Sequence, residues 1–518
     1  MGETVATNRV IELSFGAAGV DPAMELDLLV TDPAGTTRRV PGFWAGGERW
    51  VVRYSSPLPG VHRWRTECAA SGLADRNGEL TVAPSSSNHP LYDGGALRVA
   101  AGGRHLEQAD GTPFFWLGDT WWMALCGRLR GDEFETLARD RVAKGFNLIQ
   151  LVAGLFPDMA GYDPRGANEG GQAWLPDWAG PNPAWWDHAD GKVRALVEAG
   201  LMPALLGCWG YYLLWLGVAR MKRHWRYLIA RWGAYPVVWV LAGEGAMPWY
   251  LTDTRDEDRA AQIEGWSELA RYVRATDPFG RLITIHPTDQ ATKQVNDRAL
   301  LDLDMLQTGH GDWRTAAPTL RLVSGAVGEE PPLPVINGEV CYEGIGGGCG
   351  PQIQRLMFWL SILSGARGYT YGANGLWQVN RDDEPYGPSP HGMAWGGPTW
   401  DEAMRLPGGA QLGLARRLLE RYEWWRLGAA GGAEPDPHGP LAATIPDQLW
   451  LVYLPTLCAY RPPEIQGLGM GERWRAWLFN PVDGAEHPVG EAVADDQGRW
   501  RLPTRLPLYQ DWLLVLER

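Results

Sequence analysis

Lysine is nearly absent from the chain. Only four of its 47 basic residues are Lys, and all the others are Arg. Acidic residues outnumber the basic ones, so the formal net charge is −14 and the isoelectric point is about 5.3. This charge argues against nucleic acid or an anionic membrane surface as the partner, because both attract basic proteins.

Several short motifs are also missing. The six Cys residues contain no CxxC pair, which excludes a zinc ribbon and a common redox motif. We expect free thiols, although Cys341 and Cys349 flank a glycine-rich loop and could pair. That loop, 344–350, lacks the GK[ST] ending of a phosphate cradle, and no ligand-spaced cluster predicts a metal site. The sequence therefore predicts neither a metal nor a cofactor.

Membrane and export signals are not visible either. No uninterrupted apolar run reaches the roughly 20 residues that a membrane span needs. The first residues, MGETVATNRVIELSF, have no basic segment followed by an apolar one, as a signal peptide would. We therefore expect a cytoplasmic protein without a membrane partner. The sequence leaves open whether the chain forms a homo-oligomer.

Tryptophan, in contrast, is abundant. The chain has 29 Trp residues. Many of them can be explained as core residues. Those in loops have a second explanation, because flat indole rings stack on the C–H faces of sugar rings.

Three regions differ in their sequence pattern. Residues 1–88 and 428–518 contain short alternating runs between Pro and Gly turns, which is typical of small all-β sandwiches. Residues 89–427 alternate between apolar strands and helix-length segments. Segments 83–95 and 427–440 have the composition of linkers.

The middle region predicts an α/β fold, a (β/α)8 TIM barrel, with eight strands each followed by a helix. The fifth helix, near 292–301, is weak. The predicted strands are 114–122, 147–154, 202–210, 237–244, 282–288, 304–311, 334–340 and 368–375.

Two carboxylates end apolar strands of this barrel. Glu244 follows PVVWVLAG and Glu339 ends PVINGE, the fourth and seventh strands. Catalytic groups of such barrels sit at the carboxyl ends of strands, and these two strands lie nearly opposite each other. Two carboxylates across one pocket are the minimum for hydrolysing a glycosidic bond. The alternative is that each acid is a solvated rim residue.

Further acids and tryptophans are candidates for substrate binding. Asp119 ends the first strand and has the oxygens to accept hydrogen bonds from sugar hydroxyls, or it caps the next turn. Trp121 and Trp122 follow it and predict a wall of the pocket. Glu343 lies four residues past Glu339, where it either competes for the nucleophile role or fixes the loop.

Other polar and aromatic residues near strand ends complete the candidate site. His286 and His310 end the fifth and sixth strands, where we expect hydrogen bonds to substrate or to a catalytic Glu. Gln150 lies within the second strand and alternatively faces the barrel core. The remaining candidates for sugar contacts are Trp209, Tyr371 and Trp377.

Together these motifs resemble a known family. HPLYDGGALRV, DGTPFFWLGDTWW, GFNLIQLV, VVWVLAGE and PVINGEVCYEG are similar to the apiosidase-like glycoside hydrolases. In that family a (β/α)8 catalytic barrel often follows a β-sandwich and precedes a second sandwich of the type labelled collagen-binding. The resemblance covers nearly the whole chain.

The resemblance implies a retaining glycosidase acting on an oligosaccharide or glycoside. Glu244 matches its acid/base position, Glu339 its nucleophile position and Asp119 its first-strand Asp. Gly243 stands where the wider clan of such barrels often has Asn, which leaves the sugar class open. The alternative hypothesis is a barrel that binds carbohydrate without cleaving it, or an assembly protein.

Overall fold

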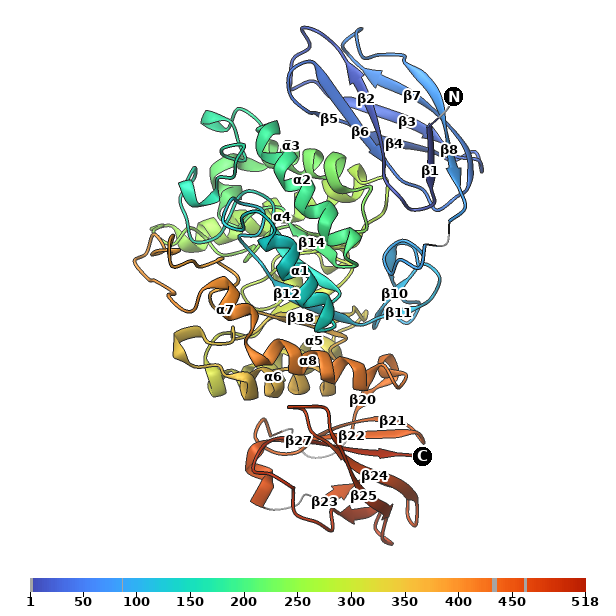
Figure 1. Cartoon of the computed structure of the whole chain (residues 1–518), viewed down its shortest axis with the longest axis vertical. Coiled ribbons are helices and arrows are strands. Elements are labelled where there is room, and N and C mark those ends of the chain that lie inside the picture. Colours follow the sequence, from blue (N-terminus) through green and yellow to red (C-terminus); the bar gives the residue numbers. More distant parts are fainter. Residues whose placement is uncertain (1–2, 86, 431–435, 461–463) are drawn as a thin grey trace.

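Three bodies follow one another along the long axis of the molecule (Figure 1). The computed structural model describes residues 3–85, 87–430, 436–460 and 464–518. A β-sandwich, a central barrel and a second set of β-sheets confirm the predicted fold class. The domain boundaries at 88/89 and 427/428 stay a prediction, and residues 86 and 431–435 of the predicted linkers lie outside the described residues.

The first sandwich packs a five-stranded sheet, β1-β8-β7-β3-β4, against a three-stranded one, β2-β6-β5. In β2 the apolar Leu13 and Phe15 are buried while Glu12 and Ser14 are exposed, the alternation of a strand with one buried face. The strands are β1 Glu3–Ala6, β2 Ile11–Gly16, β3 Leu26–Thr31, β4 Thr37–Pro41, β5 Phe43–Trp44, β6 Arg49–Tyr54, β7 Gly60–Cys68 and β8 Asn77–Ala83.

The central body is a barrel of eight parallel strands in the order β16-β15-β14-β13-β12-β19-β18-β17. Every residue of these strands is buried, as expected of strands that helices cover on the outside. A bridge between Gln290 and Leu306 lies at the seam of the barrel. Each predicted segment contains one strand: β12 Trp116–Thr120, β13 Leu148–Val152, β14 Met202–Leu206, β15 Val238–Val240, β16 Ile283–Thr284, β17 Asp304–Gln307, β18 Val335–Glu339 and β19 Gly368–Tyr371.

In the described part of the chain, α-helices follow every barrel strand except β16. There, two short 3₁₀ turns, Ala291–Lys293 and Arg298–Leu300, replace the helix expected at 292–301. That expectation is wrong because the Asp297 side chain accepts a hydrogen bond from the Ala299 N–H and starts a separate turn. The helices are α1 Glu133–Ala143, α2 Pro183–Glu198, α3 Tyr212–Trp232, α4 Arg255–Thr276, α5 Ala316–Gly328, α6 Pro351–Leu363, α7 Trp400–Met404 and α8 Pro407–Leu419. None of the described helices is both long and apolar enough to cross a bilayer.

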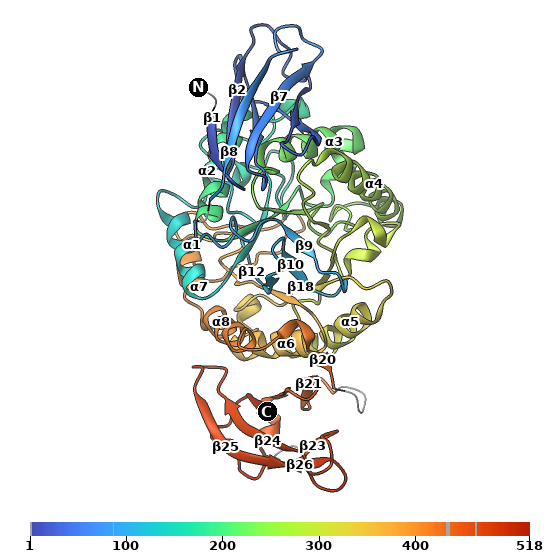
Figure 2. The ribbon, with the colours of Figure 1, turned by 90° about the vertical axis from the view of Figure 1, so that its right-hand side faces the viewer.

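A small antiparallel sheet covers the end of the barrel at which the strands begin (Figure 2). Arg104, between its first two strands, donates to the Val327 carbonyl and to Glu330, in the segment that leads into β18. This sheet does not cover the opposite end of the barrel, at which the strands stop. The three strands are β9 Leu97–Val99, β10 Leu106–Gln108 and β11 Pro113–Phe114.

The C-terminal sheets share a hydrophobic core with the barrel. Side chains of β22, including Leu451 and Tyr453, belong to the same buried cluster as α6. Arg355 of α6 also donates to Asp511 at 2.6 and 2.8 Å, with both side chains buried. The strands are β20 Gly428–Ala429, β21 Leu441–Ile445, β22 Leu449–Leu454, β23 Glu464–Gln466, β24 Arg473–Phe479, β25 Glu486–Val493, β26 Arg499–Arg501 and β27 Trp512–Glu517. They form a six-stranded sheet and a two-stranded one.

Candidate active site

A cavity of about 220 Å³ opens at the carboxyl ends of the barrel strands. Both predicted catalytic acids line it. Glu339 is the last residue of β18, and Glu244 lies in the loop that follows β15. The full lining is Trp122, Pro157, Asp158, Trp209, Glu244, Met247, Tyr250, Gln307, His310, Glu339, Tyr342, Ile345, Trp377, His391 and Trp395.

One amide joins the two acids. Nε2 of Gln307 donates to Oε1 of Glu244 at 3.1 Å and to Oε1 of Glu339 at 3.3 Å. The distance between these two oxygens is therefore at most the sum of the two hydrogen-bond lengths, about 6.4 Å. Both carboxylates can thus act on the same glycosidic bond of a substrate.

Histidines surround Glu339. Nε2 of His310 lies 2.9 Å from one carboxylate oxygen, and Nε2 of His286 lies 3.0 Å from the other. Burial alone would raise the pKa of Glu339, but the two imidazoles outweigh it and lower the pKa to about 2. Glu339 is therefore an ionised carboxylate near neutral pH.

The backbone fixes the tautomer of His286. Its Nδ1 accepts a hydrogen bond from the Glu244 N–H at 3.5 Å, so the proton of a neutral ring sits on Nε2 and faces Glu339. Glu339 acts in return on His310, whose pKa it raises against the opposing effect of burial. His286 is fully buried, and the nearest charged group to its Nε2 is the Glu339 carboxylate.

Glu244 lies in a contrasting environment. Burial and the negative charge of Glu339 raise its pKa to about 7, although His286 and Gln307 pull the other way. Its Oε2 accepts a hydrogen bond from Nε1 of Trp209 at 3.3 Å. Its φ of +46° lies in the left-handed region, which is uncommon for a residue with a side chain and clusters at functional sites.

Four predicted contact residues line the cavity with the two acids. Trp122 donates from Nε1 to the Tyr342 hydroxyl at 2.9 Å, and Trp377 stacks on the same tyrosine ring. Trp209 and His310 complete this group. The structure thus brings together side chains from six strand ends.

Besides His286, five predicted contact residues lie outside the cavity and form hydrogen bonds within the protein. Asp119 is fully buried and accepts hydrogen bonds from Arg141 at 2.5 Å and from Trp121 at 2.7 Å. Glu343 accepts from the Tyr371 hydroxyl at 2.5 Å and from the backbone of Gly408. These four side chains support the strands instead of facing a substrate.

Gln150 is the fifth of them. It donates to the Gly338 carbonyl at 2.7 Å inside the barrel, in keeping with the alternative that it faces the core. For Glu343, likewise, the geometry favours fixing the loop over competing for the nucleophile role.

Nine lining residues were not among the predicted site residues: the apolar Pro157, Met247 and Ile345, and six with polar or aromatic side chains. Gln307 ends β17, but the predicted strand runs on to 311, so the strand-end rule that selected Glu339 passed over it. Tyr342 is three residues past Glu339, and its hydroxyl faces that carboxylate, which together with burial raises the pKa of the tyrosine. The other four come from long loops without any motif: Asp158, Tyr250, His391 and Trp395.

Across the described ranges, no group of three or more His, Cys, Asp or Glu side chains is arranged to hold a metal. All six cysteines are unbonded thiols, and Cys341 and Cys349 are both buried.

We compared the chain with protein-family models, with curated proteins and with solved structures. The family described as "Apiosidase-like, catalytic domain" matches residues 100–426, and a domain of unknown function (DUF5060) matches residues 4–69. No curated protein matches the sequence.

Among the solved structures that resemble the chain, three are described here. A glycoside hydrolase is 23% identical with a TM-score of 0.64, covering 82% of this chain and 97% of its own. A family 5 glycoside hydrolase from Bacteroides vulgatus ATCC 8482 is 22% identical with a TM-score of 0.65, covering 82% and 93%. A candidate glycoside hydrolase from the same strain is 17% identical with a TM-score of 0.73, covering all of both chains. At these identities the likeness shows the fold.

Proposed function

We propose that this chain, which belongs to the apiosidase-like family, is a glycoside hydrolase that cleaves its substrate with retention of configuration. In this proposal Glu339 is the nucleophile and Glu244 the general acid/base. The observation that carries it is the pair of acids bridged by Gln307, one with its pKa lowered to about 2 and the other with its pKa raised to about 7.

The separation of the acids supports double displacement. Retaining glycosidases hold their carboxyl groups about 5–5.5 Å apart, whereas inverting ones leave about 6.5–9.5 Å for a water molecule. Gln307 holds one oxygen of Glu244 and one oxygen of Glu339 no more than about 6.4 Å apart, a limit that includes the spacing of a retaining pair.

The reaction follows from the two protonation states. Glu339, ionised and held by His286 and His310, attacks the anomeric carbon while protonated Glu244 gives its proton to the departing oxygen. Formation of the glycosyl ester neutralises Glu339 and removes the charge that raised the pKa of Glu244. Glu244 is then a base for the incoming water, which releases the sugar and restores Glu339.

Leaving groups test the role of Glu244. A dinitrophenol departs without protonation, so Glu244→Ala should form the intermediate on dinitrophenyl glycosides at near the wild-type rate. On an alkyl alcohol leaving group the variant should be slower by about 10²–10⁴-fold, the usual contribution of general acid catalysis. An equal loss on both substrates would rule out the proton-donor role.

A panel of nitrophenyl glycosides should identify the sugar. It has to include furanosides as well as pyranosides, because the family description refers to apiose, a furanose sugar. Turnover of one member supports hydrolysis. Sugar binding without turnover on the panel or on natural oligosaccharides would instead favour the carbohydrate-binding barrel.

A further inference from the structure

Three loops meet at Asp158, on one wall of the cavity. Asp158 follows β13, Tyr250 follows β15 and Trp395 follows β19. The Tyr250 hydroxyl donates to Oδ1 of Asp158 at 2.8 Å, and Nε1 of Trp395 donates to Oδ2 at 2.8 Å. Nε2 of His391 lies 4.0 Å from Oδ1. These four side chains, which we call the end wall, connect the loops that follow β13, β15 and β19.

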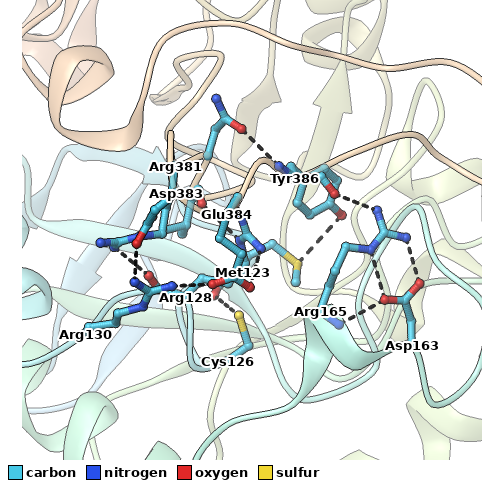
Figure 3. Close-up of polar contacts among 12 residues, drawn as sticks. Met123, Cys126, Arg128, Arg130, Asp163, Arg165, Arg381, Asp383, Glu384 and Tyr386 are labelled. Carbon is cyan, nitrogen blue, oxygen red and sulfur yellow. Dashed lines mark hydrogen bonds and ion pairs between the residues drawn. The ribbon is translucent and has the colours of Figure 1, made fainter.

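Arginines hold the loop that supplies His391 and Trp395 (Figure 3). Nε of Arg128 donates to the Val379 carbonyl at 3.0 Å, and Nη1 of Arg165 donates to the carbonyl of Tyr386 at 3.1 Å. Arg165 also donates to the backbone carbonyl of Asp158 at 3.2 Å. The loop after β13 and the loop after β19 are therefore fastened to each other outside the cavity, so the end wall is fixed.

Asp158 retains unused hydrogen-bonding capacity. A carboxylate offers about four acceptor positions, and each oxygen of Asp158 receives one close protein donor. Its φ of +55° lies in the left-handed region, so the chain holds this side chain in place at some conformational cost. The geometry suits a carboxylate that accepts hydrogen bonds from sugar hydroxyls.

The charge of the cavity limits what it accepts. Three carboxylates line it, Asp158, Glu244 and Glu339, whereas none of the described lining residues is Arg or Lys. A sugar carboxylate or sulfate at the end wall would therefore face Asp158 without a cation that forms bidentate pairs. The volume of about 220 Å³ also lies below the roughly 300–1,000 Å³ of ordinary ligand pockets, which suits a single sugar ring.

We propose that the end wall closes the pocket on one uncharged terminal sugar, whose hydroxyls Asp158 binds, so that the enzyme acts on chain ends. This inference rests on the proposed function for the cleavage step alone. The bond that breaks joins the anomeric carbon of that terminal sugar to the oxygen of the next unit, and water supplies the hydroxyl and the proton.

The product pattern tests action at chain ends. The substrate is an end-labelled oligosaccharide of the sugar that the nitrophenyl panel identifies. Single sugars should appear from the first time points, with labelled products that shorten by one unit. Labelled fragments from internal cleavage at early times would overturn the proposal even though hydrolysis itself had been established.

Binding tests the pocket without any turnover. Calorimetry on the wild-type chain uses the methyl glycosides of the neutral panel sugars beside methyl glucuronide and methyl galacturonide. At least one neutral glycoside should bind and the uronides should not. Equal binding of uronides, or no binding by any neutral glycoside, would overturn the proposal, and this result requires no variant to fold.

Asp158→Asn tests the residue itself. Hydrogen bonds to a charged group are worth more than neutral ones, so the variant should weaken binding of the neutral glycoside by about 10–100-fold. Asp382→Asn is the matched control, because Asp382 is exposed on the loop after β19 and lines no part of the cavity. Wild-type affinity in Asp158→Asn would overturn the assignment of Asp158, whether or not the chain hydrolyses anything.

Discussion

The indole of Trp209 lies against the backbone of Gly243. A Cβ atom at position 243 would stand 2.3 Å from two carbons of that ring, well inside van der Waals contact. Trp209 cannot withdraw easily, because its ring packs edge-on against Trp122 at 5.6 Å and beside His286 at 6.2 Å. A side chain as large as Asn therefore has no room at position 243, and the indole N–H that fills this space donates to Glu244.

Gly243→Ala should therefore damage both stability and activity. Overpacking of this kind costs about 1–3 kcal/mol of folding free energy. Displacing the indole also removes its hydrogen bond to Glu244, so we expect kcat/KM to fall by about 10-fold, in line with the loss of one hydrogen bond to a charged group. Denaturation midpoints and kinetics on the best panel substrate measure the two effects.

Gly191→Ala serves as the control for that variant. A Cβ at position 191, within α2, meets no atom within 4 Å. This substitution should leave kcat/KM unchanged and raise stability slightly, because Ala is the better helix former. If Gly243→Ala behaved in the same way, the contact with Trp209 would be of no consequence.

The pH dependence should be asymmetric. Glu244 must be protonated to act as an acid, and its pKa is raised to about 7, so kcat/KM should fall as the pH rises through 7. Glu339 must be ionised, and its pKa of about 2 leaves the rate flat across the mildly acidic range. A decline between pH 6 and 4 in a chain that stays folded by circular dichroism would contradict this assignment.

His310→Asn should bring the acidic limb into view. His310 is one of the two groups that hold the pKa of Glu339 down, so its removal raises that pKa. The acidic fall of kcat/KM should then begin at a higher pH than in the wild-type enzyme. An unchanged profile would mean that His286 alone sets the ionisation of Glu339.

Glu339→Ala should reduce turnover by several orders of magnitude while the chain stays folded. Azide can take the vacated position and attack from the same side, so the product should be a glycosyl azide of inverted configuration, which NMR identifies. Glu343→Ala is the matched change four residues away, outside the cavity. Azide rescue of that variant, with Glu339→Ala remaining active, would make Glu343 the nucleophile.

Asp119→Ala should act on stability rather than on substrate affinity. It leaves the fully buried Arg141 without one of its carboxylate partners, and breaking a buried ion pair typically costs about 3–5 kcal/mol. Replacing Arg141 with Met in the same chain should recover part of the loss. Thermal unfolding of the full chain measures both effects. A higher KM without a change in stability would instead assign Asp119 a role in substrate binding.

Most of the fold was accessible from the sequence because the barrel strands are apolar along their whole length. Segments such as VVWVLAGE admit few other interpretations, and their number and spacing identify the barrel. The prediction of a helix in the fifth unit was wrong because the Asp297 side chain accepts a backbone hydrogen bond and forms a turn there. The segment has few apolar residues, so its pattern does not distinguish a helix from a turn.

The site was only partly accessible. Glu244 and Glu339 were found because a single acid at the end of an apolar strand is conspicuous. Asp119 meets the same description, yet the arginine that sequesters it lies 22 residues later in the chain, and nothing in the sequence reveals that pairing. Asp158 was not predicted because it lies in a loop away from any strand end, and only tertiary contacts bring that loop to the cavity.

The core that β22 shares with α6 bears on how the chain can be divided. Arg355 is bound to Asp511 in the last strand region, and the ring of Trp359 stacks on Tyr453. The C-terminal sheets are therefore not a portable module that can be removed or exchanged. A chain ended at residue 427 would leave α6 with a bare apolar face and Arg355 without its carboxylate partner, and we expect it to aggregate instead of giving a smaller working enzyme.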